Sequence, residues 1–148
     1  MGYLNFSNIG FNLKIRKPYK STIILNCAMK RHAKVNGNII VGLTENVSFK
    51  SNNEADKEVE AKIDTGATRS SIDIKLASQL NLGPVIKSKI VKSAHGNKLR
   101  PVIEAEITLA EKKIKSEFTL ADRTHMKYAV LIGVNVLKHG FLVDPSEK

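Results

Sequence analysis

The chain has 148 residues, and a single domain of this length buries roughly 70% of the surface that its unfolded form exposes. Its 24 basic residues outnumber its 14 acidic residues and give a formal net charge of +10. Such a charge ordinarily indicates an acidic partner, for example nucleic acid, an anionic membrane or an acidic peptide. No apolar run approaches the roughly 18 residues that a membrane-spanning helix needs, so we expect a soluble protein that does not enter a membrane.

The positive charge is concentrated at the amino-terminal end. The first 44 residues hold seven basic residues and no acidic one, which leaves seventeen basic and fourteen acidic residues in the remainder. We therefore divide the chain into a basic arm, residues 1–34, and one domain, residues 35–148. The arm shows neither sustained helical nor strand periodicity and is expected to be disordered. Three interpretations of it stay open: a segment that binds nucleic acid, a targeting segment, or an extension upstream of a natural start at Met29.

A single cysteine, Cys27, lies in this arm. One cysteine cannot form an intramolecular disulfide, and a chain without disulfides is typical of a reducing compartment. The apolar run around Cys27 is shorter and more polar than the core of a secretory signal, and no small-residue cleavage site follows it. We expect a cytoplasmic protein in which Cys27 is inert.

The domain begins with short β-like runs that alternate with polar turns. Residues 38–49 predict a strand pair or a bent strand, and residues 51–60 open with a strong loop composition. Alternation resumes in residues 59–64. One face of this strand carries Val59, Ala61 and Ile63. Asp64 follows at the end of the strand, just past its apolar face.

Helical spacing of apolar residues follows the Asp64 turn. It predicts a short amphipathic helix within residues 70–83, with Gly83-Pro84 as its stop. The apolar stripe consists of Ile72, Leu76 and Leu80.

The rest of the chain again has β character. Residues 85–122 predict three or four strands, with a hairpin tip at residues 94–97 and the clearest alternation in residues 101–109. The apolar run at 128–133 predicts a strand buried on both faces, which Gly133 ends before a helical turn. These elements predict a mainly β barrel or sandwich with one or two short helices.

The candidate for chemistry is the triplet Asp64-Thr65-Gly66. A carboxylate activates water for amide hydrolysis when a second, protonated carboxyl group lies close by and shares a proton with it. Glycine lets the backbone turn sharply next to the acid, and a threonine hydroxyl offers a hydrogen bond to an opposing loop. The other candidate aspartates, Asp73, Asp122 and Asp144, lack the following glycine. If Asp64 is catalytic, its partner must therefore come from a second copy of the chain across a two-fold axis.

Residues 63–67 (IDTGA) and 129–137 (AVLIGVNVL) together resemble the retropepsin pattern. The ordered set of similar segments comprises residues 62–72, 91–109, 118–137 and 141–146. In order and spacing it is similar to the bacterial and archaeal retropepsin-like proteins labelled "ATP-dependent zinc proteases", which are associated with RimK-type glutamate ligases. The resemblance covers about residues 38–146.

The resemblance implies a retropepsin-like acid-protease barrel with one half-site per chain, acting as a homodimeric aspartic endopeptidase through the Asp64 loop. It assigns catalysis to Asp64, with Thr65, Gly66 and Ala67 supporting the active-site loop. It also implies a flap-like hairpin that binds substrate. The flap candidates are His95, Gly96, Asn97, Lys98 and Arg100.

Two hypotheses about the basic flap residues Lys98 and Arg100 stay open. They line a cleft for acidic, glutamate-rich peptides, as in relatives that trim oligoglutamate tails, or they form a solvated hairpin face. The chain also departs from its relatives at two places, with Val134 where they commonly carry arginine and Thr68 where viral retropepsins carry the acid that pairs with it. The local ion pair and its support for the dimer are therefore absent.

We predict no metal and no cofactor. The sequence has neither an H-E-x-x-H helix motif nor a G-x-x-x-x-G-K-[ST] loop. The histidines are scattered and are interpreted as surface or turn residues: His32, His95, His125 and His139. Asp122 and Arg123 are interpreted as a structural ion pair or turn. Besides proteolysis, two functions stay open: a catalytically silent peptide-binding module, and nucleic-acid binding through the basic arm.

Overall fold

The computed structural model describes residues 31–51, 55–93 and 96–147, and these form a compact unit that begins at His32. Residues 1–30 of the predicted basic arm, Cys27 among them, lie outside the described residues.

The unit is mainly β, as the sequence predicts. Its strands are β1 (Lys34–Val35), β2 (Asn38–Val41), β3 (Thr44–Phe49), β4 (Lys57–Ile63), β5 (Ser70–Asp73), β6 (Val85–Ser93), β7 (Gly96–Leu109), β8 (Lys112–Ala121), β9 (Val130–Ile132) and β10 (Phe141–Val143). Two short helices, α3 (Ile74–Gln79) and α4 (Val134–Leu137), accompany them. In the part of the chain that the structure describes, no helix has the length and apolar character needed to cross a membrane.

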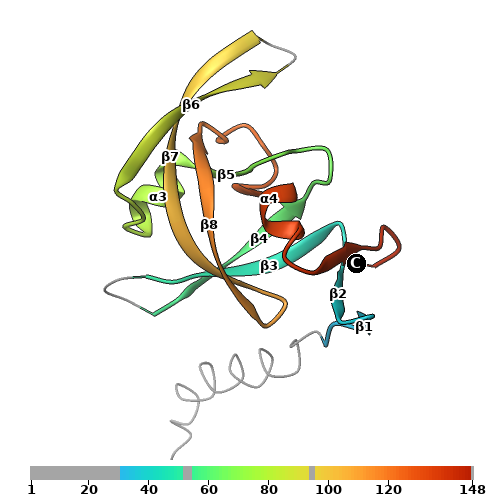
Figure 1. The fold of residues 1–148 in the computed structure, drawn as a ribbon. Helices are drawn as coiled ribbons and strands as arrows, with labels where there is room; N and C mark the ends of the chain where they lie inside the picture. Colours follow the sequence, from blue (N-terminus) through green and yellow to red (C-terminus); the bar gives the residue numbers. More distant parts are fainter. Residues whose placement is uncertain (1–30, 52–54, 94–95, 148) are drawn as a thin grey trace, which may run out of the picture. The chain divides into compact units, whose positions relative to one another are not determined.

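The main sheet closes on itself. Its seven strands follow the order β3-β4-β9-β5-β8-β7-β6. Strand β3 also pairs with β7, so every strand of this order except β6 belongs to a closed barrel (Figure 1). The interior is filled by side chains such as Phe49 and Phe118, whose rings meet edge to face with centroids 5.6 Å apart. Both are fully buried.

Strand β7 belongs to the barrel in its second half only. Its residues 102–109 pair with β8, whereas residues 96–101 pair with β6 alone. The hairpin of residues 85–101 therefore projects beyond the barrel, as the upper part of Figure 1 shows. We call it the flap hairpin. Residues 94–95 lie outside the described residues, and the pairing of Ser93 with Gly96 confirms the predicted hairpin.

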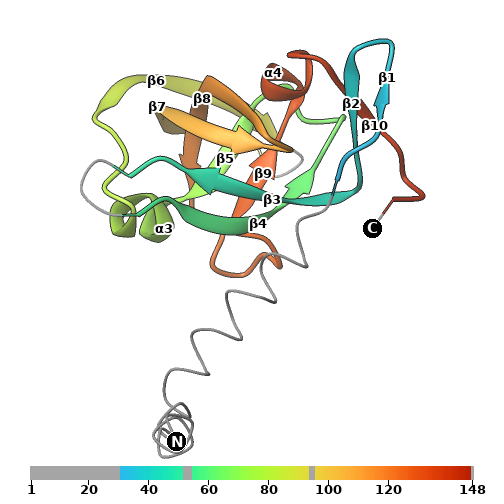
Figure 2. The same cartoon turned by 90° about the horizontal axis from the view of Figure 1, so that it is seen from below.

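A second, three-stranded sheet joins the two ends of the unit. Its order is β1-β2-β10, and β10 runs parallel to β2, with Phe141 opposite Ile39. Figure 2 shows this sheet to one side of the barrel. Phe141 and Ile39 are buried, so the small sheet shares the core of the domain.

The predicted helix begins later than its apolar spacing suggests. Residues Ser70–Asp73 form the strand β5, and Ile72 enters the core from that strand and not from a helix. The helix starts after Asp73, because the Asp73 carboxylate accepts hydrogen bonds from the amides of Lys75 and Leu76 at 2.9 and 3.3 Å. It ends with Leu80 as its carboxyl-terminal cap, before the predicted Gly83-Pro84 stop.

Residues 38–49 form two strands, β2 and β3, which lie in different sheets and do not pair with each other. Two further predicted strands are confirmed. Strand β4 buries Ala61 and Ile63 and half-buries Val59, and Asp64 follows its last residue. Strand β9 lies between β4 and β5, which buries Val130 and Ile132 completely. Gly133 then forms the amino-terminal cap of α4.

Candidate active site

Asp64 opens the loop of residues 64–69, which we call the Asp64 loop. Its amide donates to the carbonyl of Ile132 at 2.9 Å and so continues the pairing of β4 with β9 by one residue. Its carboxylate Oδ1 accepts a hydrogen bond from the Gly66 amide at 2.9 Å, and the Ala67 amide donates to the Asp64 carbonyl at 3.3 Å. These contacts fix the direction of a partly exposed carboxylate.

Gly133 makes this loop possible because the two backbones approach closely. A β-carbon at position 133 would lie 2.6 Å from the carbonyl oxygen of Ala67 and 2.6 Å from the carbonyl carbon of Arg69. The close approach lets the amide of Val134 donate to Ala67 at 2.8 Å and the amide of Asn135 donate to Thr68 at 3.2 Å. The glycine that follows the apolar strand is therefore required by packing against the Asp64 loop.

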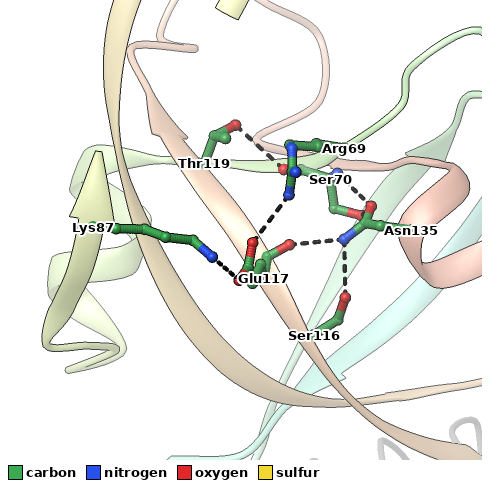
Figure 3. Close-up of polar contacts among 7 residues, drawn as sticks. All are labelled: Arg69, Ser70, Lys87, Ser116, Glu117, Thr119 and Asn135. Atoms are coloured by element: carbon green, nitrogen blue, oxygen red, sulfur yellow. Dashed lines mark hydrogen bonds and ion pairs between the residues drawn. The ribbon is translucent and has the colours of Figure 1, made fainter. Parts of the chain in front are cut away.

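Asn135 fastens the end of the loop to the barrel (Figure 3). Its Oδ1 accepts hydrogen bonds from the amide and the hydroxyl of Ser70 at 2.7 and 2.9 Å. Its Nδ2 donates to Ser116 Oγ and to the Glu117 carbonyl, both at 2.9 Å. The Ser70 hydroxyl in turn accepts from the Gly133 amide at 3.0 Å. These contacts connect the loop, α4 and β8 in one network, so each position depends on the others.

The remaining loop residues are mostly exposed. Thr65, Gly66 and Thr68 are exposed, and Ala67 is half-buried. Val134, which lies against the same loop, has 40% of its surface exposed. The predicted loop residues thus form an open face beside the Asp64 carboxylate.

The structure places the predicted flap residues on β7, except His95, which lies outside the described residues. Gly96 begins the strand with a φ of 100°, Asn97 and Lys98 are exposed, and Arg100 is half-buried. Lys98 lies opposite Val91 and Arg100 lies opposite Lys89. Because side chains alternate along a strand, the residues on one face of the hairpin are Lys87, Lys89, Lys98 and Arg100.

Arg100 of this basic face acts electrostatically on Arg123, a residue that the sequence indicated only as part of a structural ion pair or turn. The guanidinium of Arg123 donates to the Tyr128 carbonyl at 2.9 Å and to Ser71 Oγ at 3.1 Å. Burial lowers the pKa of Arg123, and the charge of Arg100 lowers it further. The carboxylates of Asp73 and Asp64 act in the opposite direction. The pKa of Arg123 therefore depends on a charge in the flap hairpin and on the charge of Asp64.

Asp122 and Arg123 serve separate structural contacts. The Asp122 carboxylate accepts from the amide and hydroxyl of Thr124, and these hydrogen bonds lower the pKa of Asp122. The Arg123 amide donates to Asp73 Oδ2 at 2.8 Å. Both residues thus stabilise the turn that follows β8.

One histidine is not at the surface, contrary to the sequence interpretation. His32 has 11% of its side chain exposed, and its Nε2 lies 3.0 Å from Glu45 Oε2. The Glu45 carboxylate also accepts from the Gly42 amide at 2.8 Å. His32 and this mostly buried acid belong to different segments of the chain, so residue spacing alone did not reveal the burial of His32. Within residues 31–51, 55–93 and 96–147, no three histidine, cysteine or acidic side chains lie together as a metal site would require.

Residues 75–148, half of the chain, match the model of the family described as "RimB-like: Retropepsin-like aspartic endopeptidase RimB". The chain belongs to this family. The matched residues include the flap hairpin, α4 and β10, and the Asp64 loop lies just before them. No curated protein matches the chain.

Solved structures show that this RimB-like chain has the retropepsin fold. The protease of EIAV in complex with the inhibitor HBY-793 has a TM-score of 0.54 and 20% identity, over 65% of this chain and 85% of the viral one. Protein Lpg0085 from Legionella pneumophila, described as having unknown function, has a TM-score of 0.51 and 22% identity, over 76% of this chain and 95% of that one. The predicted family and fold class are confirmed.

Proposed function

We propose that this RimB-like chain hydrolyses peptide bonds as a homodimer, in which Asp64 of each copy contributes one carboxyl group to a shared site. The observation that carries the proposal is the Asp64 loop, which holds a partly exposed carboxylate by a backbone hydrogen bond of 2.9 Å at the end of a barrel strand. One carboxyl group, ionised, removes a proton from water, and the other, protonated, donates to the peptide carbonyl.

The engagement of the other candidate aspartates supports a second chain as the source of the second carboxyl group. Asp73 uses one oxygen to cap α3 and the other to accept from the Arg123 amide. Asp122 and Asp144 are held in their own turns by hydrogen bonds from Thr124 and Ser146. None of these three carboxylates is free to join Asp64 without losing a structural contact.

The open face of the Asp64 loop is the proposed contact between copies. It presents the exposed threonines Thr65 and Thr68 together with Val134. An exposed valine beside small hydroxyl residues suits contact with an identical surface, since none of these three side chains carries a charge.

Acidic, glutamate-rich peptides are the proposed substrates. The flap hairpin carries four basic residues on one face, and Arg100 on that face interacts electrostatically with Arg123 near Asp64. Adjacent positive charges of this kind repel one another, and a substrate carboxylate between them would relieve that repulsion. Peptides rich in glutamate should therefore be preferred over neutral or basic ones.

The test uses the full chain and two matched variants, Asp64→Asn and Asp144→Asn. Peptide libraries that include polyglutamate are offered from about pH 4 to 8, and cleavage is followed by mass spectrometry while sedimentation reports the oligomeric state. We expect the wild type and Asp144→Asn to cleave as dimers and Asp64→Asn to bind without cleaving. Binding without cleavage by the wild type would identify a silent peptide-binding module, and a strictly monomeric chain that cleaves would contradict the shared site.

A further inference from the structure

Glu117 of β8 connects two parts of the domain that face the proposed substrate (Figure 3). One of its carboxylate oxygens accepts a hydrogen bond from Lys87 of the flap hairpin. The other accepts from Arg69 Nη1, at the end of the Asp64 loop, at 3.0 Å. A single carboxylate therefore bridges the flap hairpin and the Asp64 loop.

The first residues of β6 need such a contact because their strand pairing is weak. Strand β6 lies at the edge of the sheet, and in the described part of the chain its strand pairing is with β7 alone. The ladder is interrupted by a register shift between Val85 and Lys87. Val85 and Ile86 are 54% and 49% exposed, so little apolar burial holds this end. Segments with few buried contacts and an irregular ladder open most easily.

The ion pair with Lys87 spans three strands. Lys87 lies opposite Val102 of β7, and Val102 lies opposite Thr119 of β8. Glu117 precedes Thr119 by two residues and so shares its face of the sheet. Lys87 thus reaches diagonally over β7, and the pair adds a connection that the hydrogen-bond ladder lacks.

The backbone of Glu117 and the end of the Asp64 loop are both held by Asn135. Its carbonyl accepts from Asn135 Nδ2 at 2.9 Å, and Asn135 also holds Ser70, the neighbour of Arg69. Glu117 and the Asp64 loop therefore share one anchor within the barrel. The flap hairpin is the partner whose position can change when the carboxylate changes.

We propose that Glu117 is a positioning residue that holds the flap hairpin over the Asp64 loop through its ion pairs with Lys87 and Arg69. For its effect on substrate this inference rests on the proposed function. A hairpin that covers a peptide must open to admit it, and Lys87 and Glu117, 40% and 29% exposed, form a pair that water can replace. Loss of the pair shifts the hairpin toward its open position.

The experiment measures backbone amide hydrogen exchange of the full chain. Glu117→Gln removes the charge of the bridge, and Lys87→Met removes only its hairpin arm while keeping the apolar stem. Lys89→Met is the matched control on the same strand, since Lys89 acts on Glu117 only through its charge. Glu104→Gln is the control on the neighbouring strand, where Glu104 pairs with Lys115 at 2.8 Å.

We expect amides in residues 87–93 to exchange about two- to fivefold faster in Glu117→Gln and in Lys87→Met, as loss of an exposed ion pair predicts. Both controls should show the wild-type exchange rate in these residues. With a cleavable peptide, Glu117→Gln should raise KM by a similar factor and change kcat less, because a smaller fraction of the protein is in the closed form.

Unchanged exchange in either bridge variant, or equal acceleration in Lys89→Met, would overturn the inference. The outcome is separate from that of the proposed function. If the chain cleaves no peptide but its hairpin exchange responds to Glu117→Gln, the positioning role of Glu117 stands and the proteolytic assignment is wrong. If the chain cleaves peptide normally but neither substitution changes its hairpin exchange, only the positioning role of Glu117 is wrong.

Discussion

Asn135 accepts both hydrogen bonds that Ser70 donates, one from the amide at 2.7 Å and one from the hydroxyl at 2.9 Å. Ser70 is completely buried, so neither group has water as an alternative partner. This contact joins α4, which follows β9, to the first residue of β5. The shape of the Asp64 loop, which ends just before Ser70, therefore depends on a side chain that lies much further along the chain.

Replacement of Asn135 by alanine should destabilise the domain by about 2 to 3 kcal/mol. The substitution leaves the buried amide and hydroxyl of Ser70 without an acceptor, and an unsatisfied buried group costs about 1 to 3 kcal/mol. Chemical denaturation measures the change. Asn46→Ala is the control, because Asn46 is exposed on β3 and its loss should stay within about 0.5 kcal/mol. Equal effects of the two substitutions would contradict the role of Asn135.

Gly133→Ala should cost about 3 kcal/mol or more in unfolding free energy. Gly133 has a φ of −101°, which alanine adopts freely, so the cost comes from the backbone atoms of Ala67 and Arg69 that its β-carbon would meet.

Gly37→Ala separates this steric cause from backbone strain. Gly37 has a φ of 81°, and a β-carbon added there would meet no atom within 4 Å, so its substitution should cost about 1 kcal/mol. Thermal unfolding of both variants gives the comparison. A Gly133→Ala variant as stable as Gly37→Ala would show that the loop moves aside at little cost.

Local signals explain how much of the fold was predictable. The alternation of Ala61 and Ile63, followed by an acid and a glycine, identifies the end of β4, because each residue's environment is set by its near neighbours. The same holds for the apolar run of β9 and the glycine that ends it. The catalytic candidate therefore follows from the sequence together with the family resemblance.

Distant contacts explain what was not predictable. Ile72 belongs to a strand because β8 and β9 flank it, whereas its spacing to Leu76 also fits a helix. Glu117 is one of several charged residues on an alternating strand, and only the folded chain shows that Lys87 and Arg69 meet there. A contact between strands far apart in sequence leaves no periodic signal in either segment.

The double variant Val134→Arg with Thr68→Asp should form the proposed dimer about two- to fivefold more tightly than Val134→Arg alone, because the acid pairs with the introduced arginine. The amide of Asn135 donates to the carbonyl of Thr68 at 3.2 Å, so residues 134 and 68 are neighbours across the loop. Both are exposed, and an exposed ion pair contributes about 0.2 to 1 kcal/mol. Sedimentation at several protein concentrations measures the dissociation constant. Val134→Arg alone provides the control, and a double variant that dimerises no better than this single one would contradict the prediction.

The contribution of Glu117 to the unfolding free energy should decrease as the pH falls into the acid range. The hydrogen bond from Lys87 lowers the pKa of Glu117 below its ordinary value of 4.5, and the charges of Lys87, Arg69 and Lys89 add to this against the effect of burial. Glu104 faces Glu117 from the adjacent position on β7. A carboxyl group with a lowered pKa in the folded state stabilises the protein above its unfolded pKa. That stabilisation is lost as pH falls through the folded pKa.

The difference in unfolding free energy between the wild type and Glu117→Gln should therefore be constant from neutral pH down to the ordinary glutamate range and should shrink at lower pH. Denaturation of both proteins across this range measures it. Glu104→Gln leaves the bridge of Glu117 with Lys87 and Arg69 in place, so the same acid-dependent loss should persist when Glu117→Gln is compared in that background. A difference that grows as pH falls would mean that the protonated carboxyl group is the favoured form, which the two basic partners of Glu117 oppose.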